Sequence, residues 1–95
     1  MDILQLSHYL DNLLDIPSIS DAPNALNGLQ VQNMGEIKKI GLAVDLCQAT
    51  IDLAIEKNCQ MLFVHHGIFW GGLQQVRGPF YKKISSMMRA NLGLY

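Results

Sequence analysis

Two short apolar segments on either side of a helical pattern constrain the fold of this chain more than any other feature. Residues 37–44 place Ile40, Leu42 and Val44 on one side, which predicts a strand. Apolar residues at helical spacing predict a helix from about residue 47 to 57. Residues 61–64 form a continuous apolar run, which is typical of a strand buried on both faces. This order predicts a βαβ unit with parallel strands.

Further elements are predicted on both sides of this unit. A helix is expected over residues 2–14 with Asp2 as its cap, then an irregular loop over 16–27, a short strand over 28–31 and a turn over 33–36. Pro79 can open a last helix that runs to about residue 91, Gly93 would end it, and residues 94–95 would begin another strand. Because both strands of the unit are expected to be buried, helices should cover both faces of the sheet. The expected fold is an α/β three-layer sandwich with a mainly parallel sheet, in a single domain of residues 1–95.

Composition excludes several classes of protein. Hydrophobic residues make up 49% of the 95 residues and charged residues 16%, so disorder is not expected. The net charge of -1 argues against electrostatic binding of nucleic acid, and pairs such as Lys82–Lys83 usually lie on a solvated face. No apolar run approaches the roughly 18 residues of a membrane span, and the N-terminus lacks a signal peptide, so we expect a cytoplasmic protein. Cys47 and Cys59 are expected to be buried free thiols. The high apolar share suggests an oligomer or a part of something larger.

Three polar residues follow the two predicted strands. Asp45 ends the first strand, and His65 and His66 end the second. Parallel strands bring their carboxyl ends to the same edge of a sheet, so these side chains should lie near one another. Imidazole is the commonest metal ligand, and the glycines that follow would let both rings turn toward one concavity. From the residues alone, the interpretation in which one ring packs in the core and the other faces solvent is slightly favoured.

Other residues with chemical potential have plainer interpretations. Asp45 is a candidate metal ligand, a partner of an imidazole or the N-cap of the next helix, and the cap is favoured. Phe69 and Trp70 either pack the turn or form a stacking wall for a planar substrate, and packing is favoured. His8 is expected to be an ordinary helix residue. No dinucleotide-binding, phosphate-loop or nucleophile-elbow motif occurs.

Three segments resemble motifs of a known family. Residues 61–71, Met-Leu-Phe-Val-His-His-Gly-Ile-Phe-Trp-Gly, resemble the metal-binding signature of the NGG-interacting-factor-three-like family, whose members are often named GTP cyclohydrolase 1 type 2 homologues. Residues 27–31 resemble the family's early Asn-Gly-Leu-Gln-Val motif, and residues 40–45 resemble the strand before its first crossover helix. The resemblance covers essentially the whole chain in the family's order.

The resemblance implies an α/β fold of two similar halves with a dinuclear metal site between them. It implies that His65 and His66 bind divalent metal ions, such as zinc, iron or manganese, two ions per site in the full-length family. It also implies ring-shaped homo-oligomers, commonly hexamers. The family's other ligands are an Asp soon after the next strand and a His and a Glu near the C-terminus. These have no counterpart here, and family chains run to about twice this length or more, so this chain looks like an N-terminal portion.

Two hypotheses of function follow from the resemblance. The first is a metal-dependent hydrolase, in which metal-activated water attacks a small-molecule, nucleotide-like substrate. The second is a non-catalytic binding or transcription-regulatory module with a structural metal. In either case, affinity for metal is expected to be weak in this chain, and the chain by itself is not expected to retain full activity.

Overall fold

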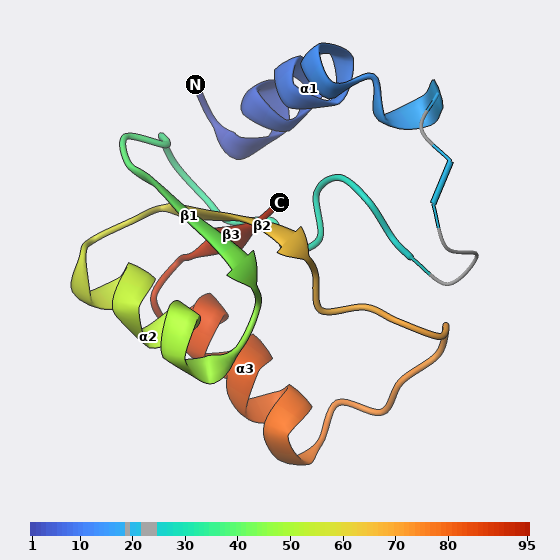
Figure 1. Ribbon diagram of the computed structural model, residues 1–95. Helices are drawn as coiled ribbons and strands as arrows, with labels where there is room; N and C mark the ends of the chain where they lie inside the picture. Colours follow the sequence, from blue (N-terminus) through green and yellow to red (C-terminus); the bar gives the residue numbers. More distant parts are fainter. Residues whose placement is uncertain (19, 22–24) are drawn as a thin grey trace.

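The chain forms a small parallel sheet with helices on both sides. The computed structural model describes residues 1–18, 20–21 and 25–95. In these residues the helices are α1 (Ile3–Leu14), η1 (Ile16–Ser18, a 3-10 helix), α2 (Gln48–Glu56) and α3 (Gly78–Arg89), and the strands are β1 (Ile40–Asp45), β2 (Met61–His66) and β3 (Gly93–Leu94). The described strands form one sheet in the order β1-β2-β3, and both neighbouring pairs are parallel (Figure 1). The predicted α/β fold around a βαβ unit is confirmed.

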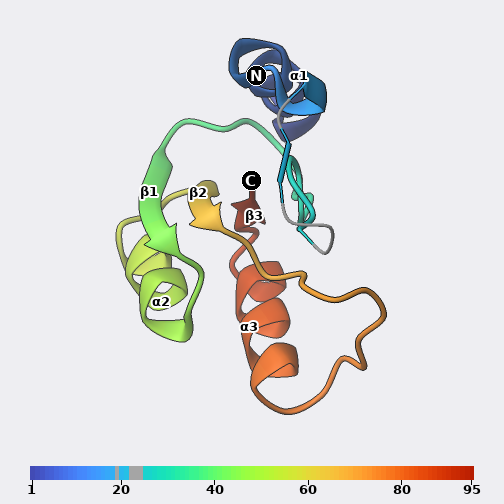
Figure 2. The same cartoon turned by 45° about the vertical axis from the view of Figure 1, so that its right-hand side comes forward.

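The main core lies between the sheet and one pair of helices. Helices α2 and α3 lie side by side beneath the sheet in Figures 1 and 2. Gly41 of β1 leaves room for the core beneath the sheet, because a Cβ there would lie 3.3 Å from Cys59 Sγ, 3.4 Å from Leu62 Cδ1 and 3.9 Å from the Cβ of Ala54 on α2. Asn58 ends the α2 segment in the left-handed conformation (φ 60°), as predicted. Side chains from α2, β2, α3, β3 and the link between α3 and β3 fill this core: Ile51, Ala54, Leu62, Met87, Leu92 and Leu94.

Helix α1 packs on the opposite face of the sheet. Asp2 caps it as predicted, in a reciprocal arrangement with Gln5. Its buried Ile3 packs with Met61 and Tyr95 in a second apolar cluster, which also includes Leu6, Leu10, Leu29, Ile37 and Phe63. Gly93 is required at the start of β3, because a Cβ at this position would overlap Ile3 and lie 3.1 Å from the Val31 carbonyl oxygen. The fold therefore has three layers.

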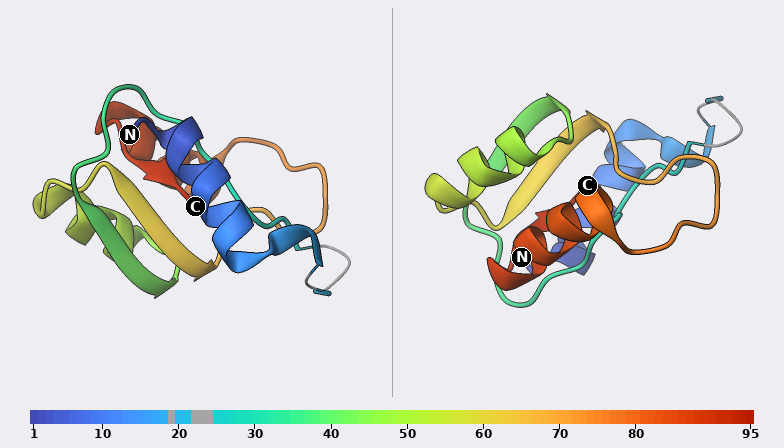
Figure 3. Two further views of the ribbon diagram at one scale, coloured as in Figure 1. Left: turned by 90° about the horizontal axis from the view of Figure 1, so that it is seen from above. Right: turned by 90° about the horizontal axis from the view of Figure 1, so that it is seen from below.

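The expectation that both strands of the βαβ unit are buried is wrong for β1. Strand β1 lies at the edge of the sheet. Its Leu42 and Val44 are 78% and 64% exposed, and Ile40 is 41% exposed. Viewed from above, α1 runs over the β3 side of the sheet and leaves β1 uncovered (Figure 3, left). The alternation in the sequence identified the side on which these residues lie, but it did not show whether a helix covers them.

Several predicted boundaries also change. Residues 28–31 do not form a strand, and Val31 makes only an isolated antiparallel bridge to Leu94. The helix α3 is followed by Asn91 in the left-handed conformation (φ 53°), so it ends before Gly93. The predicted loop over 16–27 contains η1, and its residues 19 and 22–24 lie outside the described residues.

Two further expectations concern the burial of the cysteines and the absence of a membrane-spanning helix. Cys59 is buried, whereas Cys47 is only partly buried, and both thiols are free. Within residues 1–18, 20–21 and 25–95, no helix has the length and apolar character needed to span a bilayer.

Candidate functional site

The carboxyl ends of β1 and β2 meet at one edge of the sheet. Asp45 pairs in register with His66, and the backbone N–H of Leu46 donates to the carbonyl oxygen of His66 at 3.2 Å. This juxtaposition was predicted from the parallel order of the strands, and it is confirmed. The polar side chains of both strands therefore open on the same edge.

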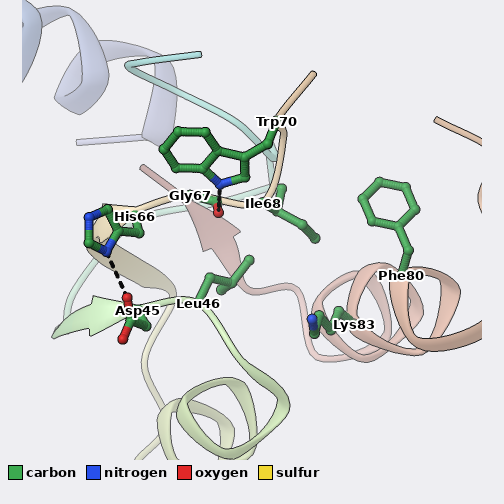
Figure 4. Close-up of a pocket in the computed structure, with 8 residues that line it drawn as sticks. All are labelled: Asp45, Leu46, His66, Gly67, Ile68, Trp70, Phe80 and Lys83. Carbon is green, nitrogen blue, oxygen red and sulfur yellow. Dashed lines mark hydrogen bonds and ion pairs between the residues drawn. The ribbon is translucent and has the colours of Figure 1, made fainter. Parts of the chain in front are cut away.

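The Asp45 carboxylate contacts the His66 imidazole directly. His66 Nδ1 and Asp45 Oδ1 lie 2.7 Å apart, and both side chains are at least half exposed (Figure 4). An ionised carboxylate can only accept hydrogen bonds, so Nδ1 carries the proton that is donated. In the neutral form of the imidazole, the other ring nitrogen, Nε2, then keeps its lone pair. The favoured interpretation of Asp45 as a helix cap is wrong: the N-cap of α2 is Cys47, and the Asp45 side chain turns toward the neighbouring strand instead.

Thr50 holds the backbone between Asp45 and α2. Its hydroxyl accepts a hydrogen bond from the Cys47 N–H at 3.0 Å and lies 3.0 Å from the carbonyl oxygens of both Asp45 and Cys47, to either of which it can donate. The pKa of the Cys47 thiol is lowered, mainly by a hydrogen bond from the Thr50 backbone N–H and secondly by one from the Thr50 side chain. The first turn of α2 thus fixes the position from which Asp45 reaches His66.

The two imidazoles lie next to each other, and both are exposed at the surface. The ring centroids of His65 and His66 are 4.5 Å apart and the ring planes are inclined by 50°. Both residues are exposed, so the interpretation in which one ring packs in the core is wrong. Both also line one groove of about 740 Å³. The prediction that the two rings turn toward one concavity is confirmed.

The wall of this groove is mostly apolar, with amide groups near the imidazoles. Leu42, Val44 and Phe63 supply the apolar wall from the sheet. Gln30 donates through Nε2 to the Leu26 carbonyl oxygen at 2.7 Å, while its Oε1 is buried and has no hydrogen-bond partner among the described residues. Gly67 lies close beside it, because a Cβ there would lie 3.3 Å from that Oε1. Reasoning from residue types and spacing did not single out Gln30, and only its place in the segment 27–31 drew attention to it.

A second, smaller pocket of about 360 Å³ lies beside His66. It is lined by Asp45, Leu46, His66, Gly67, Ile68, Trp70, Phe80 and Lys83 (Figure 4). The Trp70 indole is 45% exposed, donates through Nε1 to the Gly67 carbonyl oxygen at 3.0 Å, and has its ring 6.3 Å from that of His66. Phe69 instead packs edge-on against Phe80 at 5.8 Å and adjoins the core. Packing is therefore confirmed for Phe69, whereas Trp70 is bonded within its own turn but stays outside the core.

The donor set around the imidazoles is small. His8 is exposed on α1 with Asn12 as its partner at 3.3 Å, so the interpretation of His8 as an ordinary helix residue is confirmed. Within the described part of the chain, no group of three or more His, Cys, Asp or Glu side chains is arranged to hold a metal ion. Two adjacent exposed imidazoles, one of them held through Nδ1 by Asp45, are of the residue type that binds divalent metal ions. The assignment of His65 and His66 as metal ligands stays a prediction.

Known proteins match this chain over its whole length, both in sequence and in fold. The family model described as Duf34/NIF3 (NGG1p interacting factor 3) matches residues 1–95. The chain belongs to the Duf34/NIF3 family. Two curated proteins named GTP cyclohydrolase 1 type 2 homolog, from Archaeoglobus fulgidus and Pyrococcus abyssi, are each 40% identical to this Duf34/NIF3 chain over 95 residues.

A solved structure supports the same assignment. The crystal structure of TTHA1606 from Thermus thermophilus superposes on all of this Duf34/NIF3 chain with a TM-score of 0.92 and 36% identity. The chain covers 39% of TTHA1606, 38% of the A. fulgidus protein and 37% of the P. abyssi protein. It therefore spans well under half the length of these relatives and matches the N-terminal portion that the sequence motifs indicated.

Proposed function

We propose that this Duf34/NIF3 chain supplies part of the metal centre of a metal-dependent hydrolase that acts on a small, nucleotide-like substrate. The observation that carries the proposal is the pair of exposed imidazoles at the end of β2, one of which donates through Nδ1 to Asp45 and so has Nε2 free to bind. The name of the curated relatives, GTP cyclohydrolase 1 type 2 homolog, agrees with the reaction class. The free thiols agree with a cytoplasmic location.

Each residue at the sheet edge has a role in this proposal. His65 and His66 would hold divalent zinc, iron or manganese. A bound ion of this kind supplies Lewis-acid activation of water. Asp45 orients the His66 ring and favours the tautomer in which Nε2 is unprotonated, and the groove beside both rings admits the substrate. In a chain as long as the relatives, the additional residues would supply further metal ligands, and the chain would form a ring-shaped homo-oligomer.

Removal of the two imidazoles tests this proposal. The double variant His65→Ala/His66→Ala should abolish zinc binding measured by isothermal titration calorimetry, with an unchanged circular dichroism spectrum, because both rings are exposed and support no core packing. His8→Ala is the matched control, since it removes another exposed imidazole from α1. Zinc binding that survives the double substitution would remove the site assignment. The hydrolase hypothesis is tested by measuring whether the metal-loaded chain, or its full-length relative, converts GTP to product.

A specific feature favours a second candidate, a non-catalytic binding module. Ile40, Leu42 and Val44 present an apolar face on the edge strand, which suits contact with another protein. The family description, NGG1p interacting factor 3, names a protein interaction. Metal binding without turnover of GTP or of simple phosphodiesters, together with loss of a protein partner on substitution of Leu42, would favour this candidate over the hydrolase.

A further inference from the structure

The smaller pocket beside His66 combines a lysine side chain with two aromatic side chains. Its walls come from the ends of β1 and β2, the turn that follows β2 and the first two turns of α3 (Figure 4). Its volume of about 360 Å³ falls within the range of small-molecule sites, about 300–1,000 Å³. Unlike the larger groove, it contains a basic side chain, Lys83.

Lys83 has no ionic partner within the described residues. It is partly buried on α3, and neither a carboxylate nor a carbonyl oxygen of the described chain pairs with its ammonium group. The other charged group in the pocket, Asp45, is engaged by His66 Nδ1 at 2.7 Å. Lys82, the preceding residue, is exposed and does not line the pocket. Lysine is a common binder of phosphate, to which it presents a point charge, so an anionic ligand would supply the missing partner.

The aromatic walls are held in place by their own contacts. The indole Nε1 of Trp70 is anchored on the Gly67 carbonyl oxygen at 3.0 Å, and Phe80 is packed edge-on against Phe69. Trp70 remains 45% exposed, so its ring face is accessible to a ligand. Aromatic side chains that are already fixed stack on planar rings at little cost in conformational entropy.

We infer that this pocket binds a planar aromatic ligand that bears a phosphate group, with Lys83 contacting the phosphate and Trp70 contacting the ring. The inference rests on the proposed function in that it names the substrate class for the same edge of the sheet. Binding through Lys83 and Trp70 itself requires no metal ion, so the two can be tested separately.

The sequence provides a built-in reporter for this test. Trp70 is the single tryptophan of the chain and lines both this pocket and the larger groove, so its fluorescence reports on ligands at either place, and the Lys83 variants identify those bound in this pocket. The probes are guanosine monophosphate, guanosine and inorganic phosphate, each titrated in the presence of a metal chelator. In the wild type, guanosine monophosphate should give a saturable change and should bind more tightly than either guanosine or phosphate.

Substitution of the two neighbouring lysines separates the pocket from general surface charge. Lys83→Met should weaken guanosine monophosphate binding by about tenfold, the loss expected when a hydrogen bond to a charged group is removed, and should leave guanosine binding unchanged. Lys83→Gln should behave in the same way, and it retains a polar side chain in case Met perturbs α3. Lys82→Met is the matched control and should bind like the wild type. Equal binding by the Lys83 variants and the wild type, equal weakening by Lys82→Met, or phosphate binding as tight as that of the nucleotide would overturn the inference.

A variant of His65 distinguishes failure of this inference from failure of the proposed function. His65 lines the larger groove but not this pocket. His65→Ala should therefore weaken zinc binding and leave guanosine monophosphate binding intact. Nucleotide binding that depends on Lys83, without any zinc binding, would contradict the metal centre alone. Zinc binding at His65 and His66, without nucleotide binding that depends on Lys83, would contradict the pocket alone.

Discussion

At the scale of single residues, the hydrogen bond between Asp45 and His66 is the contact that orients a side chain at the sheet edge. Metal-binding histidines usually donate their second ring N–H to a carboxylate or carbonyl group, and this fixes both the tautomer and the orientation of the ring. Here the carboxylate comes from the neighbouring strand at 2.7 Å, and the strand register sets the distance. The contact would hold the His66 ring in one orientation for the ligand role that we propose.

Substitution of Asp45 should weaken metal binding without unfolding the chain. Asp45→Ala removes the acceptor for Nδ1, and the zinc affinity should fall by about tenfold or more. Asp45→Asn should be at least as damaging, because its amide can donate to Nδ1 and so favour the tautomer with a proton on Nε2. Nitrogen-15 NMR of the neutral imidazole, combined with zinc titration, measures both effects.

An aspartate on α2, Asp52, provides the control when it is changed to asparagine. Asp52 is exposed, accepts a hydrogen bond from Gln48 at 2.8 Å and lines neither pocket, so Asp52→Asn should bind zinc like the wild type. An Asp45→Ala variant with wild-type zinc affinity would show that the carboxylate does not position the ring.

The sequence predicted some of these residues better than others. The imidazole pair and its place beside Asp45 followed from the order of the strands. The partner of Asp45 did not, because a side chain at a strand end can turn toward the next helix or the next strand, and only the register decides which. Lys83 was also missed: a Lys–Lys pair usually lies on a solvated face, but here helix geometry directs the two side chains differently, and Lys83 lines a pocket while Lys82 is exposed.

At the scale of elements, α1 depends on a few contacts with the rest of the fold. The Tyr95 hydroxyl donates to Asp11 Oδ1 at 2.6 Å, and its ring stacks on Phe63 with centroids 5.3 Å apart. Burial, followed by the hydrogen bond to Asp11, raises the pKa of the Tyr95 phenol. These contacts join α1 to the end of the parallel sheet.

The raised pKa predicts how stability changes with pH. The folded chain holds the phenol proton more tightly than the unfolded chain does, so this stabilisation is complete below the unfolded pKa of about 10 and is lost as the pH rises above it. Tyr95→Phe should lower the free energy of unfolding by about 1 kcal/mol at neutral pH and should reduce its decline at alkaline pH. Urea unfolding at several pH values measures both changes.

A second tyrosine, which lies on α1, serves as the control for this experiment. Tyr9 is 52% exposed on α1, so Tyr9→Phe should leave both the stability and its pH dependence close to those of the wild type. A Tyr95→Phe variant with the same decline at high pH as the wild type would show that another group causes the alkaline instability.

At the scale of the whole molecule, the apolar face of β1 is left uncovered. The segment pattern predicted a strand with one apolar side correctly. The pattern could not reveal that α1 lies over the β3 side of the sheet, because coverage depends on tertiary packing between distant segments (Figure 3). The chain spans 38% of the A. fulgidus relative, and its edge strand exposes Leu42 and Val44. Such an edge is a template for association.

We therefore expect the 95-residue chain to self-associate through β1. Sedimentation velocity at increasing concentration should show species larger than the 10.6 kDa monomer. Leu42→Lys/Val44→Lys should shift the distribution to monomer, because two charges on an edge strand oppose pairing with a second copy. The free energy of unfolding of the monomer should change little, because both side chains are already mostly exposed. Leu73→Lys is the matched control, since Leu73 is fully exposed in the segment between β2 and α3 and should not affect association. A wild-type chain that remains monomeric at all concentrations, or equal dissociation by Leu73→Lys, would show that the face of β1 does not drive assembly.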